Sequence, residues 1–244
     1  HERDDRRGGP VESRLIYNRD MTPLLRRVLT GLLGMAAFSG ATASIAQQPG
    51  EAAFRATYKE LIETNTALSS GSCTLAAERM AARLKAAGIK ESDLHFVIPK
   101  DKPKEGGLVA VFPGADPAAK AILLLAHVDV VEAKREDWTR DPFTLIEEGG
   151  YFYARGTLDD KAQAAIWVDL FVRFRAEGYK PARTLKLALT CGEETSGAYN
   201  GAEDLVKNHR ALIDAEFALN EGGGGRLDEA GRHQVHTVQA GEKL

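Results

Sequence analysis

One uninterrupted apolar run, residues 121–126, most constrains the fold of this chain. It reads Ala-Ile-Leu-Leu-Leu-Ala, with no alternation of polar and apolar side chains. A strand that is covered on both faces has this pattern, whereas a strand with one face in water alternates. The run therefore predicts a central strand with helices on both sides of its sheet, and the charged residues His127 and Asp129 follow it directly.

Further apolar segments alternate between strand-like and helix-like periodicity along the chain. The predicted strands span 94–98, 108–112, 143–148, 151–155, 184–190, 216–219 and 233–239. The predicted helices span 51–68, 74–87, 162–176 and 201–209. Gly149-Gly150 joins two of the strands in a hairpin, and residues 222–225 form a glycine loop. We expect a three-layer α/β/α sandwich with a mixed, mostly parallel central sheet.

The charge balance and the cysteine content exclude several classes of protein. Thirty-two Lys and Arg against 35 Asp and Glu give a net charge of −3, which favours neither nucleic acid nor an anionic membrane surface as a partner. Two cysteines, Cys73 and Cys191, are too few for a disulfide scaffold or a cysteine-rich zinc module. Two buried free thiols are favoured over a single disulfide, which an oxidising compartment would permit.

The N-terminal part of the chain has the pattern of a targeting segment. After Met21, two arginines precede an apolar run, residues 28–40, and then alternating small residues, as in a secretory signal peptide. The run is short for a membrane span, and a buried core helix is the alternative interpretation. We expect 1–20 to be an upstream extension, 21–46 a signal peptide, and 47–244 a secreted or periplasmic chain without a membrane span.

Charged side chains follow three predicted strands and the hairpin. They are His127 and Asp129, then Asp159 and Asp160, then Glu193 and Glu194, then Glu221. Ligands of open α/β sheets gather beyond the carboxyl ends of the strands. Crowded carboxylates repel one another unless protons or cations lie among them. One imidazole with several carboxylates suits zinc or a similar divalent ion, so the sequence predicts a metal site.

A series of motifs resembles the signatures of the di-zinc exopeptidase family, which includes glutamate carboxypeptidase, Gly-X carboxypeptidases, aminoacylases, carnosinase-type dipeptidases and succinyl-diaminopimelate desuccinylase. The motifs span 124–131, 138–143, 155–161, 192–194 and 220–223. They occur in the family's order, and the resemblance covers roughly residues 51–244. It implies a zinc-exopeptidase fold, of which this chain is the N-terminal portion.

The resemblance also implies a set of metal ligands. His127 would be a terminal ligand of the first zinc ion, Asp159 would bridge both ions, and Glu221 would complete the first site. Glu194 would bind the second ion. We expect two zinc ions in the full-length protein, with cobalt or manganese as alternatives.

The catalytic roles follow from the same resemblance. Glu193 would be the general base, and Asp129 would accept a hydrogen bond from the His127 ring to fix its tautomer. The peptide bond between Asp159 and Asp160 is expected to be cis. The family's chemistry is hydrolysis of an amide bond in small peptides or N-acyl amino acids.

Glu221 bears on the substrate, since Glu rather than Asp at this position resembles the carboxypeptidase and desuccinylase branches. We therefore expect a carboxypeptidase-like hydrolase, with a dipeptidase or aminoacylase as the alternative. A non-catalytic fragment that holds metal is a third interpretation. Trp138, Pro142 and Phe143 are expected to pack in the hairpin rather than shape a pocket.

The chain departs from the family at its C-terminal end. The family has a lid and dimerisation domain, which would allow a homodimer, and a downstream His in the second metal site. His233 and His236 are three apart on a predicted strand, so they should face opposite sides and not bind metal; His95 and His209 are expected at the surface. We expect this truncated chain to lack full activity and to expose a hydrophobic sheet edge.

Overall fold

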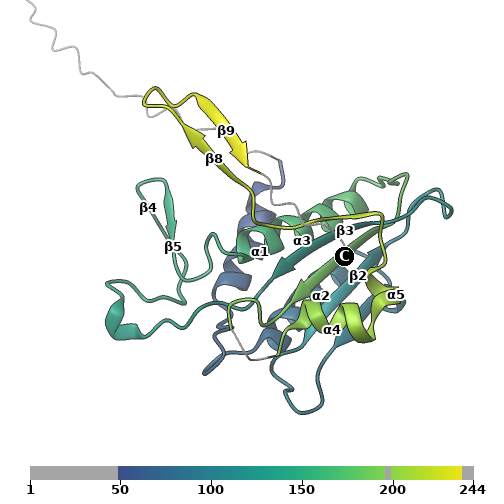
Figure 1. Cartoon of the computed structure of the whole chain (residues 1–244), viewed down its shortest axis with the longest axis horizontal. Helices are drawn as coiled ribbons and strands as arrows, with labels where there is room; N and C mark the ends of the chain where they lie inside the picture. Colours follow the sequence, from purple (N-terminus) through teal and green to yellow (C-terminus); the bar gives the residue numbers. More distant parts are fainter. Residues whose placement is uncertain (1–48, 196–198, 238–244) are drawn as a thin grey trace, which may run out of the picture. The chain divides into compact units, whose positions relative to one another are not determined.

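A computed structural model describes residues 49–195 and 199–237 of the chain (Figure 1). The α-helices are α1 (Glu51–Ile62), α2 (Cys73–Ala86), α3 (Lys161–Ala176), α4 (Gly201–Asn208) and α5 (Arg210–Ile213), and short 3-10 turns span Glu91–Asp93 and Arg135–Asp137. The strands are β1 (Leu94–Val97), β2 (Gly107–Phe112), β3 (Ile122–His127), β4 (Ile146–Glu148), β5 (Tyr151–Tyr153), β6 (Leu185–Thr190), β7 (Phe217–Leu219), β8 (Gly224–Leu227) and β9 (His233–Thr237).

The expected extension and signal peptide in residues 1–46 lie outside the described residues. Within the described ranges, every helix is too short or too polar to cross a membrane.

Five strands form the central sheet, in the order β1-β2-β6-β3-β7. β3 runs parallel to both of its neighbours, β6 and β7, whereas β2 is antiparallel to β1 and to β6. The predicted mixed sheet is thus confirmed, although its pairings divide evenly between parallel and antiparallel. Residues 122–126 of the apolar run lie in β3 as predicted, between β6 and β7.

Helices cover both faces of the sheet, which gives the predicted three layers. On one face, α1, α2 and α3 pack against alternate residues of the strands, including Leu108, Leu124 and Leu187. On the other face, Leu205 of α4 joins a smaller core with Val109, Leu123 and Ala188. β2, β3 and β6 therefore contribute side chains to two cores in alternation, because successive side chains point to opposite faces.

The ends of α2 show why this helix begins and stops where it does. The Ser72 hydroxyl accepts the Leu75 N–H at 3.1 Å, which satisfies one of the free amide groups in the first turn. Gly88 follows the helix with φ of 92°, a conformation that glycine adopts without steric cost. The predicted helix over residues 74–87 is confirmed, with each end one residue earlier. Since Cys73 is the first residue of α2, the cap also fixes the position of that side chain.

β7 is an edge strand that the described residues leave largely uncovered. All three of its residues are exposed, and Phe217 and Leu219 keep 47% and 45% of their surface. The sequence predicted an exposed hydrophobic sheet edge without assigning it to a strand. β7 pairs with the first three residues of β3, Ile122 to Leu124. Glu221 follows β7 after one intervening residue, Asn220.

One prediction in the C-terminal part is wrong, and one short helix was not predicted. The glycine loop of residues 222–225 is shorter than expected, because β8 begins at Gly224 and pairs with β9. A four-residue helix, α5, also follows α4 without a signal in the sequence. Both β8 and α5 depend on contacts with other segments, which local propensity does not encode.

Candidate metal centre

The predicted site lies where parallel strands end side by side. β3 ends at His127, which is in register with Thr190, the last residue of β6. β7 lies on the other side of β3 and is followed by Asn220-Glu221. Segments that leave neighbouring parallel strands at one edge bring their side chains together. The pairing of β3 with β6 and β7 therefore brings together residues that are far apart in the sequence.

The His127 ring lies at the centre of the cluster and is only 3% exposed. Its Nε2 atom is 2.9 Å from Asp159 Oδ1 and 3.3 Å from Glu221 Oε1. A third carboxylate oxygen, Oε2 of Glu193, is 3.8 Å from the same nitrogen. One nitrogen thus faces three acidic side chains that come from separate parts of the chain.

The other ring nitrogen of His127 faces Asp129. Nδ1 is 3.1 Å from the backbone oxygen of Asp129 and 3.5 Å from its Oδ1 atom. The second carboxylate oxygen, Oδ2, accepts the Glu194 N–H at 2.9 Å. Asp129 thus contacts the ring as expected, but the shorter contact is to its main chain. Its carboxylate also holds the segment that carries Glu193 and Glu194.

The Asp159–Asp160 turn presents two carboxylates with different surroundings. The bond between these residues is cis, as predicted. Asp159 is exposed, whereas Asp160 is 3% exposed and its Oδ2 has no hydrogen-bond partner among the described residues. The Tyr58 hydroxyl donates to the Thr157 carbonyl at 2.6 Å, which ties the turn to α1. The turn is therefore anchored while both acids face the cluster.

Asp160 is a site residue that sequence reasoning did not assign. Together with His127 and Glu221 it offers three ligand atoms within 4.8 Å of one another. His127, Glu193 and Glu194 form a second such group. The signal for Asp160 was its place directly before a helix with a buried face, which leaves little room for a solvated carboxylate.

The raised pKa values of three acids show that the cluster disfavours having all of its carboxylates ionised at once. Burial raises the pKa of Asp160 to about 7, with neighbouring Glu221 adding to the effect. Burial also raises the pKa of Glu194 and of Glu221, and the Asp159 charge acts in the same direction on both. Acids that resist ionisation beside one another are the environment in which a cation binds favourably.

The pKa of the His127 ring is also raised, and for an imidazole this favours the charged form. Burial disfavours its charged form, but the Asp129 carboxylate, with Glu221 and Asp160, outweighs burial and raises the pKa to about 10. For Asp129, burial is likewise outweighed by the His127 ring and the Glu194 N–H, so its pKa is lowered. The surrounding carboxylates therefore stabilise a positive charge at the position of the His127 ring. The oxygen-rich donors, one imidazole and an unpartnered Asp160 oxygen fit a divalent metal ion.

Lys161, the first residue of α3, is a buried residue that follows the Asp159–Asp160 turn directly. Its side chain is fully buried, and its Nζ donates to the Thr64 carbonyl at 2.7 Å. Burial lowers its pKa to about 7. Lys161 thus fixes the start of α3 to the loop after α1, and the adjacent acids with it.

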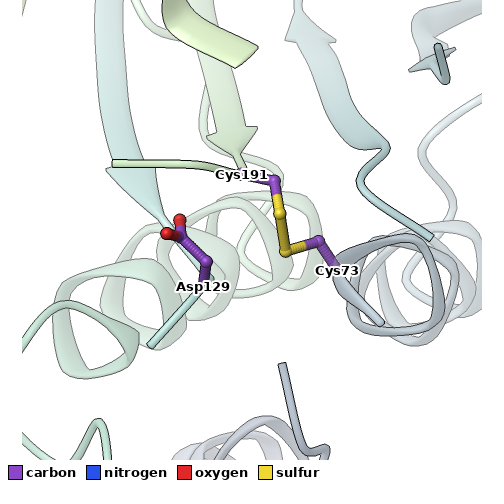
Figure 2. A group of neighbouring side chains, drawn as sticks. All are labelled: Cys73, Asp129 and Cys191. Carbon is purple, nitrogen blue, oxygen red and sulfur yellow. A yellow bond between two sulfur atoms is a disulfide. The ribbon is translucent and has the colours of Figure 1, made fainter. Parts of the chain in front are cut away.

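The two cysteines correct a prediction. Two free thiols were favoured from the sequence, but Cys73 and Cys191 form a disulfide with an S–S distance of 2.01 Å. Figure 2 shows the Asp129 carboxylate beside this bond. Each cysteine sulfur and one Asp129 oxygen lie within 4.8 Å of one another. The cysteines are 118 residues apart, so their proximity depends on the packing of α2 against the sheet.

The downstream histidines correct another prediction. His233 and His236 were expected on opposite sides of a strand, but their rings stack at 4.7 Å. A register irregularity pairs Arg226 with Val235 and Leu227 with His233. The extra residue in β9 turns both rings to one side. Neither His belongs to a ligand group among the described residues.

Other predicted side chains lie away from the cluster. The Arg155 guanidinium lies over the Trp138 ring at 5.1 Å, and Pro142 is buried beside it, with its carbonyl accepting the Arg155 N–H at 2.7 Å. His95 and His209 are partly exposed. These contacts place Trp138 and Pro142 next to the strand that leads into the Asp159 turn.

Similarity to solved structures shows the class of fold. Human carnosine dipeptidase 1 superposes with a TM-score of 0.59 at 22% identity, over 71% of this chain and 39% of that chain. The metallo-carboxypeptidase Sso-CP2 of Sulfolobus solfataricus gives a TM-score of 0.59 at 23% identity, over 73% of this chain and 39% of that one. The domain therefore has the α/β fold of M20 metallopeptidases.

Sequence similarity then relates one segment of the chain to a family. Residues 123–238 match the profile of Peptidase family M20/M25/M40. Aminoacylase-1B of Rattus norvegicus is 35% identical over 116 residues, 47% of this chain and 28% of that protein. The N-fatty-acyl-amino acid synthase/hydrolase PM20D1 of Xenopus tropicalis is 39% identical over 111 residues, 45% and 21% respectively.

Residues 123–238 are thus similar to the M20 peptidase family domain, which confirms the family group that the motifs indicated. The matched region spans less than a third of the length of these curated relatives.

Proposed function

We propose that this chain supplies the metal-binding part of a hydrolase that cleaves an amide bond in N-acyl amino acids or small peptides. The observation that carries the proposal is the convergence of one imidazole nitrogen with carboxylates that follow two strands, β6 and β7, and one that lies in the turn before α3. His127 Nε2 lies within 3.8 Å of oxygens from Asp159, Glu193 and Glu221. The similarity to the M20 peptidase family supports the same chemistry.

In this proposal, two divalent ions, zinc by preference, are held by different members of the cluster. His127 and Glu221 would hold the first ion, Glu194 the second, and Asp159 both. When bound, zinc polarises an amide carbonyl and lowers the pKa of a water molecule. Asp160 lies in the same group as His127 and Glu221, and its buried charge would stabilise bound cations.

Glu193 is the residue proposed as general base. Its side chain is 55% exposed and its Oε2 lies 3.8 Å from His127 Nε2, so it can reach both the metal cluster and an arriving substrate. It would accept the proton of the attacking water and deliver it to the leaving nitrogen. Asp129 would keep the His127 ring and the Glu194 main chain in place during that transfer.

N-acyl amino acids are the substrate class that we place first. Aminoacylase-1B and PM20D1, both named for acylated amino acids or their hydrolysis, share 35% and 39% identity with the segment that carries the site. Dipeptides are the second candidate, because carnosine dipeptidase 1 shares the fold. The carboxypeptidase-like specificity expected from Glu221 is compatible with both, since both substrates have a free carboxylate.

An oxidising compartment fits the Cys73–Cys191 disulfide, since such bonds persist in secreted and periplasmic proteins. We therefore keep secretion or periplasmic residence as part of the proposal. A homodimer also stays a proposal.

The test compares Glu193→Gln with the parent, both in the full-length protein and both loaded with zinc. Hydrolysis of N-acetyl-methionine and of a dipeptide is measured, and bound zinc is quantified in the same samples. Removing a general base should lower turnover by roughly 10²–10⁴-fold while zinc content stays equal. Glu78→Gln, on the exposed face of α2, is the matched control. Zinc binding without hydrolysis by the parent protein would instead support the non-catalytic interpretation.

A further inference from the structure

The Cys73–Cys191 disulfide ends at the segment that carries the proposed base and a proposed metal ligand. Cys191 directly follows β6, and only Gly192 separates it from Glu193-Glu194. Cys73 is the first residue of α2, which packs on the sheet through Ala76, Ala77 and Met80. The covalent bond therefore fixes the segment after β6 to a helix that is itself anchored in the core.

This segment has few other attachments within the described residues. The Cys191 carbonyl accepts a hydrogen bond from the Gly201 N–H at 2.7 Å. The Gly192 carbonyl accepts one from the Asn200 side-chain amide, Nδ2, at 3.4 Å. The Glu194 N–H donates to Asp129 Oδ2 at 2.9 Å. The first two bonds hold the main chain before Glu193, and the third depends on the carboxylate that lies against the sulfurs.

The disulfide also packs against the group that orients the His127 ring. Both cysteines and Asp129 are at least 95% buried, and their ligand atoms lie within 4.8 Å of one another (Figure 2). With the sulfurs on one side and the Glu194 amide on another, the Asp129 carboxylate has little freedom to turn. Separation of the sulfurs would let both the carboxylate and the segment after β6 shift.

We propose that the Cys73–Cys191 disulfide is a positioning element of the metal centre, so that metal affinity depends on its oxidation. It acts through Asp129 and the main chain of Glu194 and does not touch the metal or the substrate. The inference rests on the proposed function in one respect, which is that it takes Glu194 as a metal ligand.

A cavity lies beside the bond. Its volume is about 330 Å³, and Cys73, Cys191, Asp129 and Thr195 line it. A water-soluble phosphine can reduce the disulfide there. The phosphine gives two electrons to the S–S bond and becomes a phosphine oxide with the oxygen of one water, and the two protons of that water complete the two thiols.

The test measures zinc affinity by competition with a chromogenic chelator, at a temperature where circular dichroism shows a folded protein. Oxidised protein is compared with Cys73→Ala/Cys191→Ala, which lacks both the bond and any thiol that could bind zinc. We expect the double variant to bind zinc at least about tenfold more weakly, as when groups that orient metal ligands are removed. Leu84→Ala, a buried residue of α2, is the control for general weakening of the helix and should change affinity less than twofold.

A second measurement keeps the proposal testable if the double variant does not fold. Hydrogen exchange of the Glu193 and Glu194 amides is compared in metal-free oxidised protein and in the phosphine-reduced form, and we expect faster exchange after reduction. Unchanged exchange, equal zinc affinity of the folded double variant, or an equal loss in Leu84→Ala would each overturn the inference. A zinc-bound oxidised protein that hydrolyses nothing would overturn the proposed function instead and leave this result standing.

Discussion

The Asp129 carboxylate accepts the Glu194 N–H at 2.9 Å. Because Asp129 follows β3 and Glu194 follows β6, this single hydrogen bond joins the ends of two neighbouring parallel strands. The same carboxylate lies 3.5 Å from His127 Nδ1. One anion therefore sets the orientation of the ring on one strand and the path of the main chain on the next.

Replacement of Asp129 with Asn should weaken zinc binding more than it weakens the fold. The amide keeps the size of the side chain but removes the charge that faces the ring, and loss of such partners costs roughly 10–100-fold in metal affinity. Chelator competition at neutral pH measures the change. Asp116→Asn, at an exposed position between β2 and β3, should leave affinity unaltered. Equal affinities in both variants would show that Asp129 does not orient the site.

Replacement of Gly192 with Ala should destabilise the protein through a specific collision. Gly192 has φ of 90°, and a Cβ atom there would lie 1.7 Å from the Tyr199 carbonyl oxygen. Gly231 also has a positive φ, 75°, but a Cβ atom there meets nothing within 4 Å. Ala at Gly231 should cost only the backbone term of about 1–2 kcal/mol, and Ala at Gly192 should cost more.

Urea denaturation of the two glycine variants separates the collision from the backbone term. Zinc affinity gives a second readout, because the Gly192 variant must move the main chain just before Glu193. The Gly231 variant has no such effect on the segment. Equal losses of unfolding free energy would mean that the segment after β6 adjusts freely around Tyr199.

The strands and the ligand-bearing strand ends could be predicted from sequence because their signals are local. The unbroken run before His127 defines β3, and acids directly after apolar strands must gather at one sheet edge when the strands are parallel. The evenly mixed pairing was not predictable in the same way. The direction of β2 relative to β6 is set by long-range packing rather than by the residues of either strand.

The features that the sequence did not predict share one physical cause, because each depends on contacts with another segment of the chain. Cys73 and Cys191 are 118 residues apart, and only the packing of α2 on the sheet brings their sulfurs together. The stacking of His233 on His236 depends on a bulge in the β8–β9 ladder, which a single-strand alternation rule cannot contain. Asp160 received no role from the sequence, because its proximity to His127 and Glu221 depends on how separate segments of the chain pack together.

Replacement of Tyr58 with Phe should lower stability and alter its dependence on alkaline pH. The Tyr58 hydroxyl donates to the Thr157 carbonyl at 2.6 Å, and loss of such a bond costs about 1 kcal/mol. Burial raises the pKa of Tyr58 to about 12, above its value in the unfolded chain. The unfolded state therefore loses its proton first as the pH rises, and the folded state loses stability from about pH 10 upward.

The Tyr58 prediction is checked by the difference between parent and variant across pH 8–11. The Phe variant should be less stable at pH 8, and its deficit should shrink above pH 10, since it has no hydroxyl to ionise. Tyr151→Phe, at a residue that is 70% exposed, is the control. A deficit that stays constant with pH would contradict the raised pKa.

Replacement of Glu194 with Gln should have opposite effects on stability with and without zinc. Burial, with the charges of Asp159 and Glu193, raises the pKa of Glu194, so the surroundings disfavour its ionised form. A neutral side chain of the same shape removes that repulsion and should leave the metal-free protein equally or more stable. It also removes an anionic ligand, so zinc should bind the variant more weakly.

Urea denaturation with and without zinc measures both effects in one series. At zinc concentrations near 100 times the dissociation constant, the parent should gain roughly 2.7 kcal/mol, and the variant should gain less. A chelator should return the parent to its metal-free stability and remove its disadvantage relative to the variant. If Glu194→Gln lowered stability equally in both conditions, the side chain would be structural, and crowding of carboxylates would no longer account for the affinity of the site for a cation.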